Sequence, residues 1–232
     1  MSEIPKEVLK KSGARVMSFR VGRVAEFLRR NKVVYTVRGY CDVDMRDVWI
    51  PELGLFGTRI YIREVFSEAD LRMYIKESGF SSLAMWWAVV RRMYGDSKRK
   101  HLYQVSIEPV LLDVLHGLKM YLLRHHRRQL KTAIEYLEHS QIKYFVPEDF
   151  TFSAVIKGRH GDYVTQADFV KDEISCSCQA NRGRGFVCWH SVALVLYLAQ
   201  NRYINENLAI ALFRNYLNKG APEPQVTINH FI

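Results

Sequence analysis

The chain has 232 residues, of which 48% are hydrophobic and 25% charged, a balance typical of a folded globular protein rather than a disordered one. Its start lacks the apolar stretch of a secretory signal, and the longest apolar run, residues 192–199, is far shorter than the roughly 18 residues that a membrane-spanning helix needs. These features exclude a membrane-spanning protein and predict a soluble one without a membrane partner, which we expect to be cytoplasmic.

The chain is strongly basic, with a formal net charge of +10 and a pI near 9.5. Such an excess indicates an acidic partner, most often nucleic acid, although surface cations that serve solubility produce the same excess. Residues 1–107 hold 20 Lys/Arg against 12 Asp/Glu, residues 108–145 hold 6 against 4, and residues 146–232 hold 8 against 8. The cationic excess therefore lies in the first half of the sequence.

The first 107 residues predict a polar lead-in to about Gly22, followed by helices and strands. Apolar residues recur at helical spacing at 24–28 and again at 83–94, after the start signal at 79–82. The β-branched run 33–37, the alternating segment 58–65 and the segment 102–107 are typical of strands.

The second half of the sequence predicts helices around a β-hairpin. Residues 109–140 show a helical pattern interrupted by the basic cluster 124–128, which leaves one long helix or two shorter ones open. Residues 150–156 and 163–170 are typical of a hairpin, and 192–200 of a buried helix. Asn205 can cap a last helix that runs through Leu217.

Three cysteines and a histidine form the sharpest pattern in the chain. In a strand, Cys176 and Cys178 point to the same face, and the polar loop 179–187 can fold back to bring Cys188 and His190 to the same point. Three thiolates and an imidazole complete a tetrahedral zinc shell with no position left for water. The alternative is that these four residues are ordinary small buried side chains. From the ligand set, we predict a structural Zn²⁺ site.

The order of these features resembles the SWIM zinc finger family. A β-hairpin, Cys176-x-Cys178, a short loop, Cys188-x-His190 and an apolar helix follow one another over about residues 150–201. The resemblance implies a zinc-binding module of a family associated with DNA binding or with protein–protein contact.

Segments 31–38, 57–65, 79–94 and 103–107 together resemble an ASCH domain, a small PUA-like β-barrel generally regarded as an RNA-binding fold. In the family signature G-x-K-x-x-(E/T)-x-R, Asn31 takes the glycine place, Val33 the lysine place, Thr36 the Glu/Thr place and Arg38 the arginine place. Some small ASCH proteins are amidohydrolases that use this lysine, so Val33 removes a group needed for such chemistry. Nucleotide binding is still implied by the resemblance.

Cationic residues on the predicted barrel, the following helices and the zinc loop are candidate nucleic-acid contacts, because phosphates are bound by Lys and Arg. Lys32 and Arg38 are expected to line the barrel groove. The full set is Lys32, Arg38, Arg59, Arg63, Arg124, Arg127, Arg128, Arg182 and Arg184.

We therefore expect an α+β protein with an ASCH/PUA-like barrel at 17–107, a helical connector at 108–145 and a SWIM zinc module with C-terminal helices at 146–217. The leading function is non-catalytic binding of RNA or DNA with a structural zinc site. One alternative is an adaptor whose SWIM module docks a protein partner in DNA repair or recombination. Another is a nucleoside or nucleic-acid hydrolase of the ASCH type, for which Glu64 is the only carboxylate on a strand of the barrel match.

Overall fold

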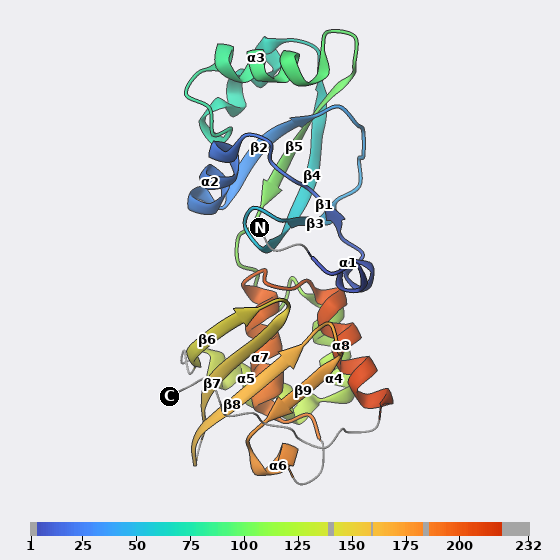
Figure 1. Cartoon of the computed structure of the whole chain (residues 1–232), viewed down its shortest axis with the longest axis vertical. Helices are drawn as coiled ribbons and strands as arrows, with labels where there is room; N and C mark the ends of the chain where they lie inside the picture. Colours follow the sequence, from blue (N-terminus) through green and yellow to red (C-terminus); the bar gives the residue numbers. More distant parts are fainter. Residues whose placement is uncertain (1–3, 139–141, 159, 183–185, 220–232) are drawn as a thin grey trace. The chain divides into compact units, whose positions relative to one another are not determined.

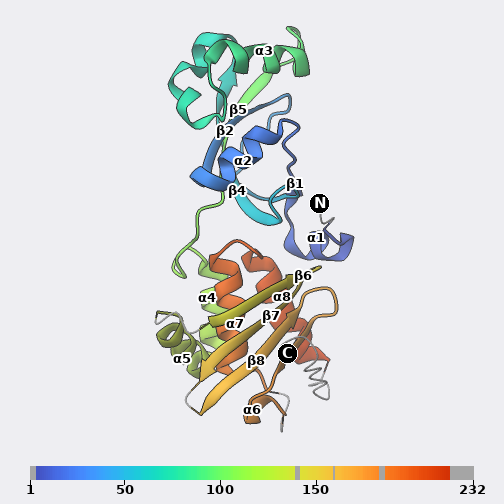
Figure 2. The same cartoon turned by 60° about the vertical axis from the view of Figure 1, so that its left-hand side comes forward.

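The computed structural model of the chain describes residues 4–138, 142–158, 160–182 and 186–219. They divide into two compact units, shown in Figures 1 and 2. The first unit contains Ala14–Pro109, and the second contains the described residues of Ile4–Gly13 and Val110–Ile232. Both units combine helices with a sheet, so the predicted α+β class is confirmed.

The first unit is built on a five-stranded sheet whose strand order is β1-β3-β4-β5-β2. β1 runs parallel to β3, and the other neighbours are antiparallel. The strands are β1 (Arg15–Val16), β2 (Val33–Arg38), β3 (Arg46–Ile50), β4 (Leu55–Val65) and β5 (Lys100–Ser106), and the helical segments are α2 (Gly22–Asn31), the 3₁₀ helix η1 (Glu68–Glu77) and α3 (Leu83–Tyr94).

This sheet is open, whereas the sequence predicts a closed barrel. The pairings among the described residues leave β1 and β2 as its two edges, and β1, with only two residues, offers too short an edge to pair with β2. Two apolar clusters hold the unit together, one around Leu28 and Val34, the other around Trp86 and Leu102. Trp86 is a core residue, as its helical apolar pattern predicts.

The second unit places a four-stranded antiparallel sheet, β6-β7-β8-β9, against helices that lie on one of its faces (Figures 1 and 2). The central helix α7 is apolar nearly all round and buried along most of its length, as expected for a helix inside a core. The strands are β6 (Ile142–Glu148), β7 (Thr151–Gly158), β8 (Gly161–Asp168) and β9 (Glu173–Cys176), and the helices are α1 (Lys6–Ser12), α4 (His116–His125), α5 (Arg127–Glu138), α6 (Gln179–Arg182), α7 (Trp189–Gln200) and α8 (Glu206–Asn218).

The segment predicted as a connector is an integral part of the second unit. It forms two helices that meet at His126; α5 packs on α7, and α4 packs on α8. The predicted cap of the last helix is confirmed, because the Asn205 side chain accepts a hydrogen bond from the Leu208 N–H at 3.1 Å. The described residues include no helix that is both long and apolar enough to cross a membrane.

The start of the chain is not the polar lead-in predicted from its composition. Residues 6–12 form α1, which belongs to the second unit and packs on α8. Its end is tied down by Asn205, whose amide donates to the Ser12 carbonyl at 2.8 Å, and by Lys11, which pairs with Asp172 at 2.7 Å.

When charged residues are counted by structural unit, the distribution of charge differs from the one along the sequence. Residues 1–3 and 14–109 hold 17 Lys/Arg against 12 Asp/Glu, a net +5, and residues 4–13 and 110–232 likewise hold 17 against 12, again +5. Because α1 carries Lys6, Lys10 and Lys11 into the second unit, the cationic excess is shared equally between the units rather than concentrated in the first.

Candidate metal centre

The four predicted ligands come from two neighbouring parts of the second unit. Cys176 is the last residue of β9, and Cys178 lies just before α6. Cys188 is the N-cap residue of α7, and His190 lies in the first turn of that helix. All four side chains are buried. The chain therefore brings a strand end and a helix start to one buried point.

The candidate ligand atoms of these residues all lie within 4.8 Å of one another. A tetrahedral zinc with thiolate ligands at about 2.3 Å and imidazole at about 2.0 Å separates its ligand atoms by roughly 3.5–4 Å. The cluster thus has the composition and nearly the size of a zinc shell. The four residues fit Zn²⁺, which the sequence predicts as the cofactor.

The polar atoms of the cluster show why a cation fits here. Within the described residues, both ring nitrogens of His190 are buried without a hydrogen-bond partner, a state that costs about 1–3 kcal/mol for one buried polar group. The Cys176 thiol hydrogen bonds to the Cys178 sulfur, which raises the pKa of Cys176 and lowers the pKa of Cys178. A divalent cation would take up the imidazole lone pair and neutralise the thiolates, because metal ligands bind in these deprotonated forms.

Two hydroxyl groups contact sulfurs of the cluster, and a third hydrogen bonds to the neighbouring strand. The Thr165 hydroxyl donates to the Cys176 sulfur at 3.3 Å, and the Ser191 hydroxyl lies 3.3 Å from the Cys188 sulfur. Ser177, between the first two cysteines, hydrogen bonds through both its hydroxyl and its N–H to the backbone of Val164 in β8. Such outer contacts orient metal ligands and adjust their basicity.

Two aromatic rings and a glycine pack around the His190 ring. The ring centroids of Tyr163 and Trp189 lie 4.4 and 3.7 Å from that of His190. A Cβ atom added to Gly158 would lie 2.8 Å from His190 Nε2 and 2.6 Å from the Tyr163 ring. Sequence reasoning missed Gly158 and Tyr163, because both fit a hairpin turn equally well; a glycine and an aromatic at the two ends of the turn are the signal that could have found them.

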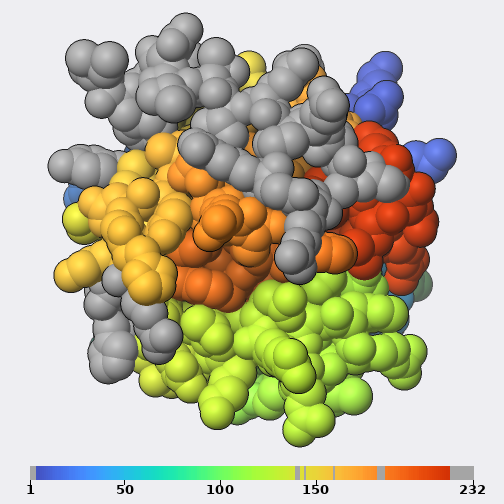
Figure 3. Space-filling model, turned by 90° about the horizontal axis from the view of Figure 1, so that it is seen from below, coloured from blue at the N-terminus to red at the C-terminus, as the bar shows by residue number. Residues whose placement is uncertain are grey.

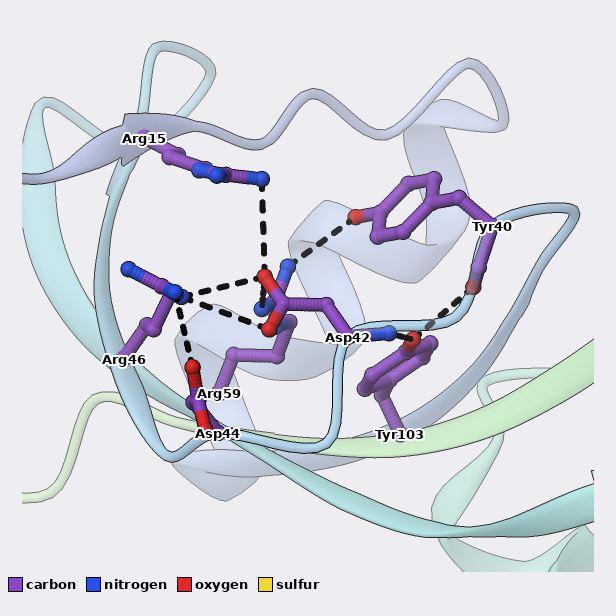
Figure 4. Close-up of polar contacts among 7 residues, drawn as sticks. All are labelled: Arg15, Tyr40, Asp42, Asp44, Arg46, Arg59 and Tyr103. Atoms are coloured by element: carbon purple, nitrogen blue, oxygen red, sulfur yellow. Dashed lines mark hydrogen bonds and ion pairs between the residues drawn. The ribbon is translucent and has the colours of Figure 1, made fainter.

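In the first unit, the predicted nucleic-acid contact Arg59 is buried, with only 1% of its surface exposed. Its guanidinium forms a close ion pair with Asp42, which also receives Arg15 and Arg46, and it donates to the Tyr40 hydroxyl at 3.4 Å (Figure 4). The prediction that Arg59 contacts nucleic acid is therefore corrected: its charge is used inside the protein, where it holds the pKa of Asp42 below its usual value.

The other cations predicted to line a barrel groove have separate surroundings. Arg38 donates to the Ser18 carbonyl at 3.1 Å, lies over the Phe19 ring and lines a cavity of about 40 Å³ together with Phe80 and Trp86. Arg63 pairs with Asp70 at 3.2 Å. Lys32 is exposed at the end of α2.

The predicted cations of the α4–α5 junction are all exposed. Arg124, Arg127 and Arg128 lie there, and Lys131 follows on α5. Within the described part of the chain, none of the four forms an ion pair. We call these four residues the junction cluster. Figure 3 shows α4 and α5 at the surface of the second unit beside α8.

Arg214 of α8 is a further cation close to α4. It is exposed and lies close enough to Tyr121 of α4 to oppose the rise that burial causes in the pKa of that tyrosine. The side chain of Arg182, another predicted contact, lies outside what the structure describes, as does residue Arg184 altogether.

The fold and the cluster together define a zinc-binding module in which a β-hairpin and a buried helix share one metal ion. The family comparison agrees: residues 163–199 match the model of the SWIM zinc finger. This match begins on β8 and ends in α7, so it spans all four ligands and lies within the second unit. No curated protein and no solved structure matches the chain.

Proposed function

We propose that this chain is a non-catalytic nucleic-acid-binding protein, of RNA or DNA, whose zinc ion is structural. The observation that carries the proposal is the junction cluster, four exposed cations without a carboxylate partner among the described residues. Exposed cations that lie near one another in the chain attract a polyanion, because each phosphate that they neutralise releases a condensed counterion.

The zinc ion has a supporting role in this proposal. Three thiolates and one imidazole fill a tetrahedral shell, so the ion has no open position for water or substrate and acts by holding its ligands together. It joins β9 to α7, and α7 is the helix against which α5 packs. The metal thereby supports the helix that carries part of the junction cluster.

For the first unit, we propose a PUA-like fold in an open form, with Arg38 as a further contact for the nucleic acid. Arg38 has no carboxylate partner among the described residues and lies beside the exposed Arg20 at the edge of an aromatic-lined cavity. Arg63 would add a weaker contact, since it already pairs with Asp70. Lys32 would add only its single exposed charge. Val33 stands in the lysine place of the ASCH signature, so we do not propose the hydrolase.

The proposal is tested by removing charges of the junction cluster without disrupting the helices that carry them. Gln replaces Arg with little change in helix propensity, so the triple variant Arg124→Gln, Arg127→Gln, Arg128→Gln should fold normally. We expect its affinity for single- and double-stranded RNA and DNA to fall for all sequences alike. The slope of log affinity against log salt should decrease by roughly two to three, at about 0.7–0.9 per lost phosphate contact.

A matched control removes the same charge from paired cations. Arg91, Lys119 and Lys143 each form an ion pair, with Asp96, Asp113 and Asp162 respectively. Their replacement by Gln should lower the affinity less and leave the salt slope nearly unchanged. Equal losses in the two triple variants would show that net charge alone, and not the junction cluster, attracts the ligand.

A second candidate function is an adaptor that docks a protein partner. One observation favours it: Phe186, which lies two residues before Cys188, exposes 60% of its surface beside the metal centre. Aromatic residues are enriched at protein–protein interfaces, so Phe186 is a candidate contact for such a partner. If the full chain binds none of the four nucleic acids at low salt, this candidate becomes the leading one.

A further inference from the structure

Asn181 lies at the centre of the zinc module, although it is not one of the metal ligands. It belongs to the short helix α6 and exposes only 2% of its surface. A buried amide is retained without cost only when its donor and acceptor are both satisfied. Its partners therefore show what this residue does.

Both ends of the Asn181 amide bond to segments that carry zinc ligands. The side-chain Oδ1 accepts from the backbone N–H of Cys176 at 2.9 Å. The Nδ2 group donates to the carbonyl of Phe186 at 3.0 Å, two residues before Cys188. One side chain thus links the end of β9 to the segment that leads into α7, across the loop between the two ligand pairs.

The backbone of Asn181 adds a third link. Its N–H donates to the Cys178 carbonyl at 3.1 Å, so the backbone of Asn181 is also tied to the first ligand pair. Tyr216 of α8 also hydrogen bonds with the Asn181 side chain. Asn181 consequently contacts α8 as well as the two ligand-bearing segments.

We infer that Asn181 is a positioning residue of the metal centre, which sets the separation of the Cys176–Cys178 pair from the Cys188–His190 pair before and after the metal binds. The role follows from geometry, because a hydrogen bond from Cys176 N–H and a hydrogen bond to Phe186 C=O fix the two backbones relative to one rigid planar amide. The inference depends on the zinc site and is independent of the nucleic-acid proposal.

The test uses the full chain with Asn181→Ala, compared with Asn205→Ala. Asn205 is a suitable control because it is also buried, lies in the same unit and makes two bridging bonds, to Leu208 and Ser12, neither of which belongs to a ligand-bearing segment. Zinc affinity is measured by competition with a chromogenic chelator. The geometry of the site is measured from the absorption bands of the Co²⁺-substituted protein, below the melting temperature of every variant.

We expect Asn181→Ala to weaken zinc binding by roughly 10–100-fold, the range typical of contacts that orient metal ligands, and to shift or broaden the Co²⁺ bands. Asn205→Ala should lower the melting temperature while leaving the Co²⁺ spectrum as in the parent. The inference is overturned if Asn181→Ala keeps the parental Co²⁺ spectrum and affinity. It is also overturned if both variants lose affinity equally with parental spectra, because Asn181 would then stabilise the fold alone.

Discussion

At the scale of single residues, the packing of the His190 ring depends on Gly158, which has no side chain. Gly158 ends β7 next to the imidazole, and any Cβ there would lie within 3 Å of two aromatic rings. The ring of Tyr163 is itself packed against His190, so neither ring can move aside without moving the ligand. The glycine is required by the space beside the ligand.

We therefore predict that Gly158→Ala weakens zinc binding and destabilises the second unit by about 1–3 kcal/mol, the usual cost of overpacking. Gly22→Ala is the matched control, because a Cβ at Gly22 meets nothing within 4 Å. Chelator competition and thermal melting measure the two effects. A Gly158→Ala protein that binds zinc as tightly as Gly22→Ala would show that the ring of His190 does not need this space.

The ligands themselves could be predicted from sequence, but their supporting residues could not. Cys176, Cys178, Cys188 and His190 are close in sequence, and their chemical types point to a metal at any reasonable backbone geometry. Asn181 and Gly158 act through hydrogen bonds and space that exist only once the hairpin, the loop and α7 have met. Arg59 illustrates the reverse error: a strand arginine suggested a phosphate contact, yet Asp42, 17 residues away, had already paired with it.

At the scale of elements, the segment between β2 and β3 is held to the sheet by Asp42. Its carboxylate receives Arg59, Arg46 and Arg15, and its N–H donates to the Tyr103 hydroxyl at 2.7 Å (Figure 4). Tyr103 is buried in β5, and burial raises its pKa to about 12. Removing the carboxylate would leave Arg59 as an unpaired charge in the interior.

We predict that Asp42→Asn destabilises the first unit and that the effect depends on pH. Because Arg59 lowers the pKa of Asp42 from 3.8, the stabilisation is present above that pH and is lost as the pH falls through the lower folded value. Hydrogen exchange of the β2–β5 amides at pH 7 and at acid pH measures it. The difference between parent and Asp42→Asn should shrink on acidification.

Asp44→Asn serves as the control for this prediction, because Asp44 is 66% exposed and, in the described part of the chain, pairs only with Arg46. We expect it to leave the protection of the β2–β5 amides nearly unchanged, as surface pairs contribute little. Equal effects of the two substitutions, or an Asp42 effect that persists at acid pH, would contradict the role assigned to the buried pair.

The strongly patterned elements were predicted, whereas several short or weakly patterned elements were not. The predicted strands at 33–37 and 58–65 and the predicted helices at 83–94 and 192–200 correspond to β2, β4, α3 and α7, whose own residues carry the hydrophobic signal. α1 has only seven residues and is held by partners about 160 to 195 residues away in sequence. β3 begins with charged residues, and the edge strand β6 contains Pro147, so neither shows the usual signal of a strand.

At the scale of the whole molecule, charge and metal are distributed differently. Each unit carries a net charge of +5, but the zinc module lies in the second unit alone. Metal binding to such a site is coupled to folding, since the unfolded chain has no preformed site and the free energy of binding therefore adds to the free energy of folding. The second unit should thus depend on zinc for its structure, and the first unit should not.

The most direct test of this account measures zinc content together with hydrogen exchange before and after chelation. We predict one zinc ion per chain, lost in Cys178→Ser. Removing the ion should abolish protection in β8, β9 and α7 while the β2–β5 amides of the first unit stay protected. A metal-free chain, or a Cys178→Ser variant, that kept the protection of α7 and melted like the parent would contradict the claim that zinc holds the second unit together.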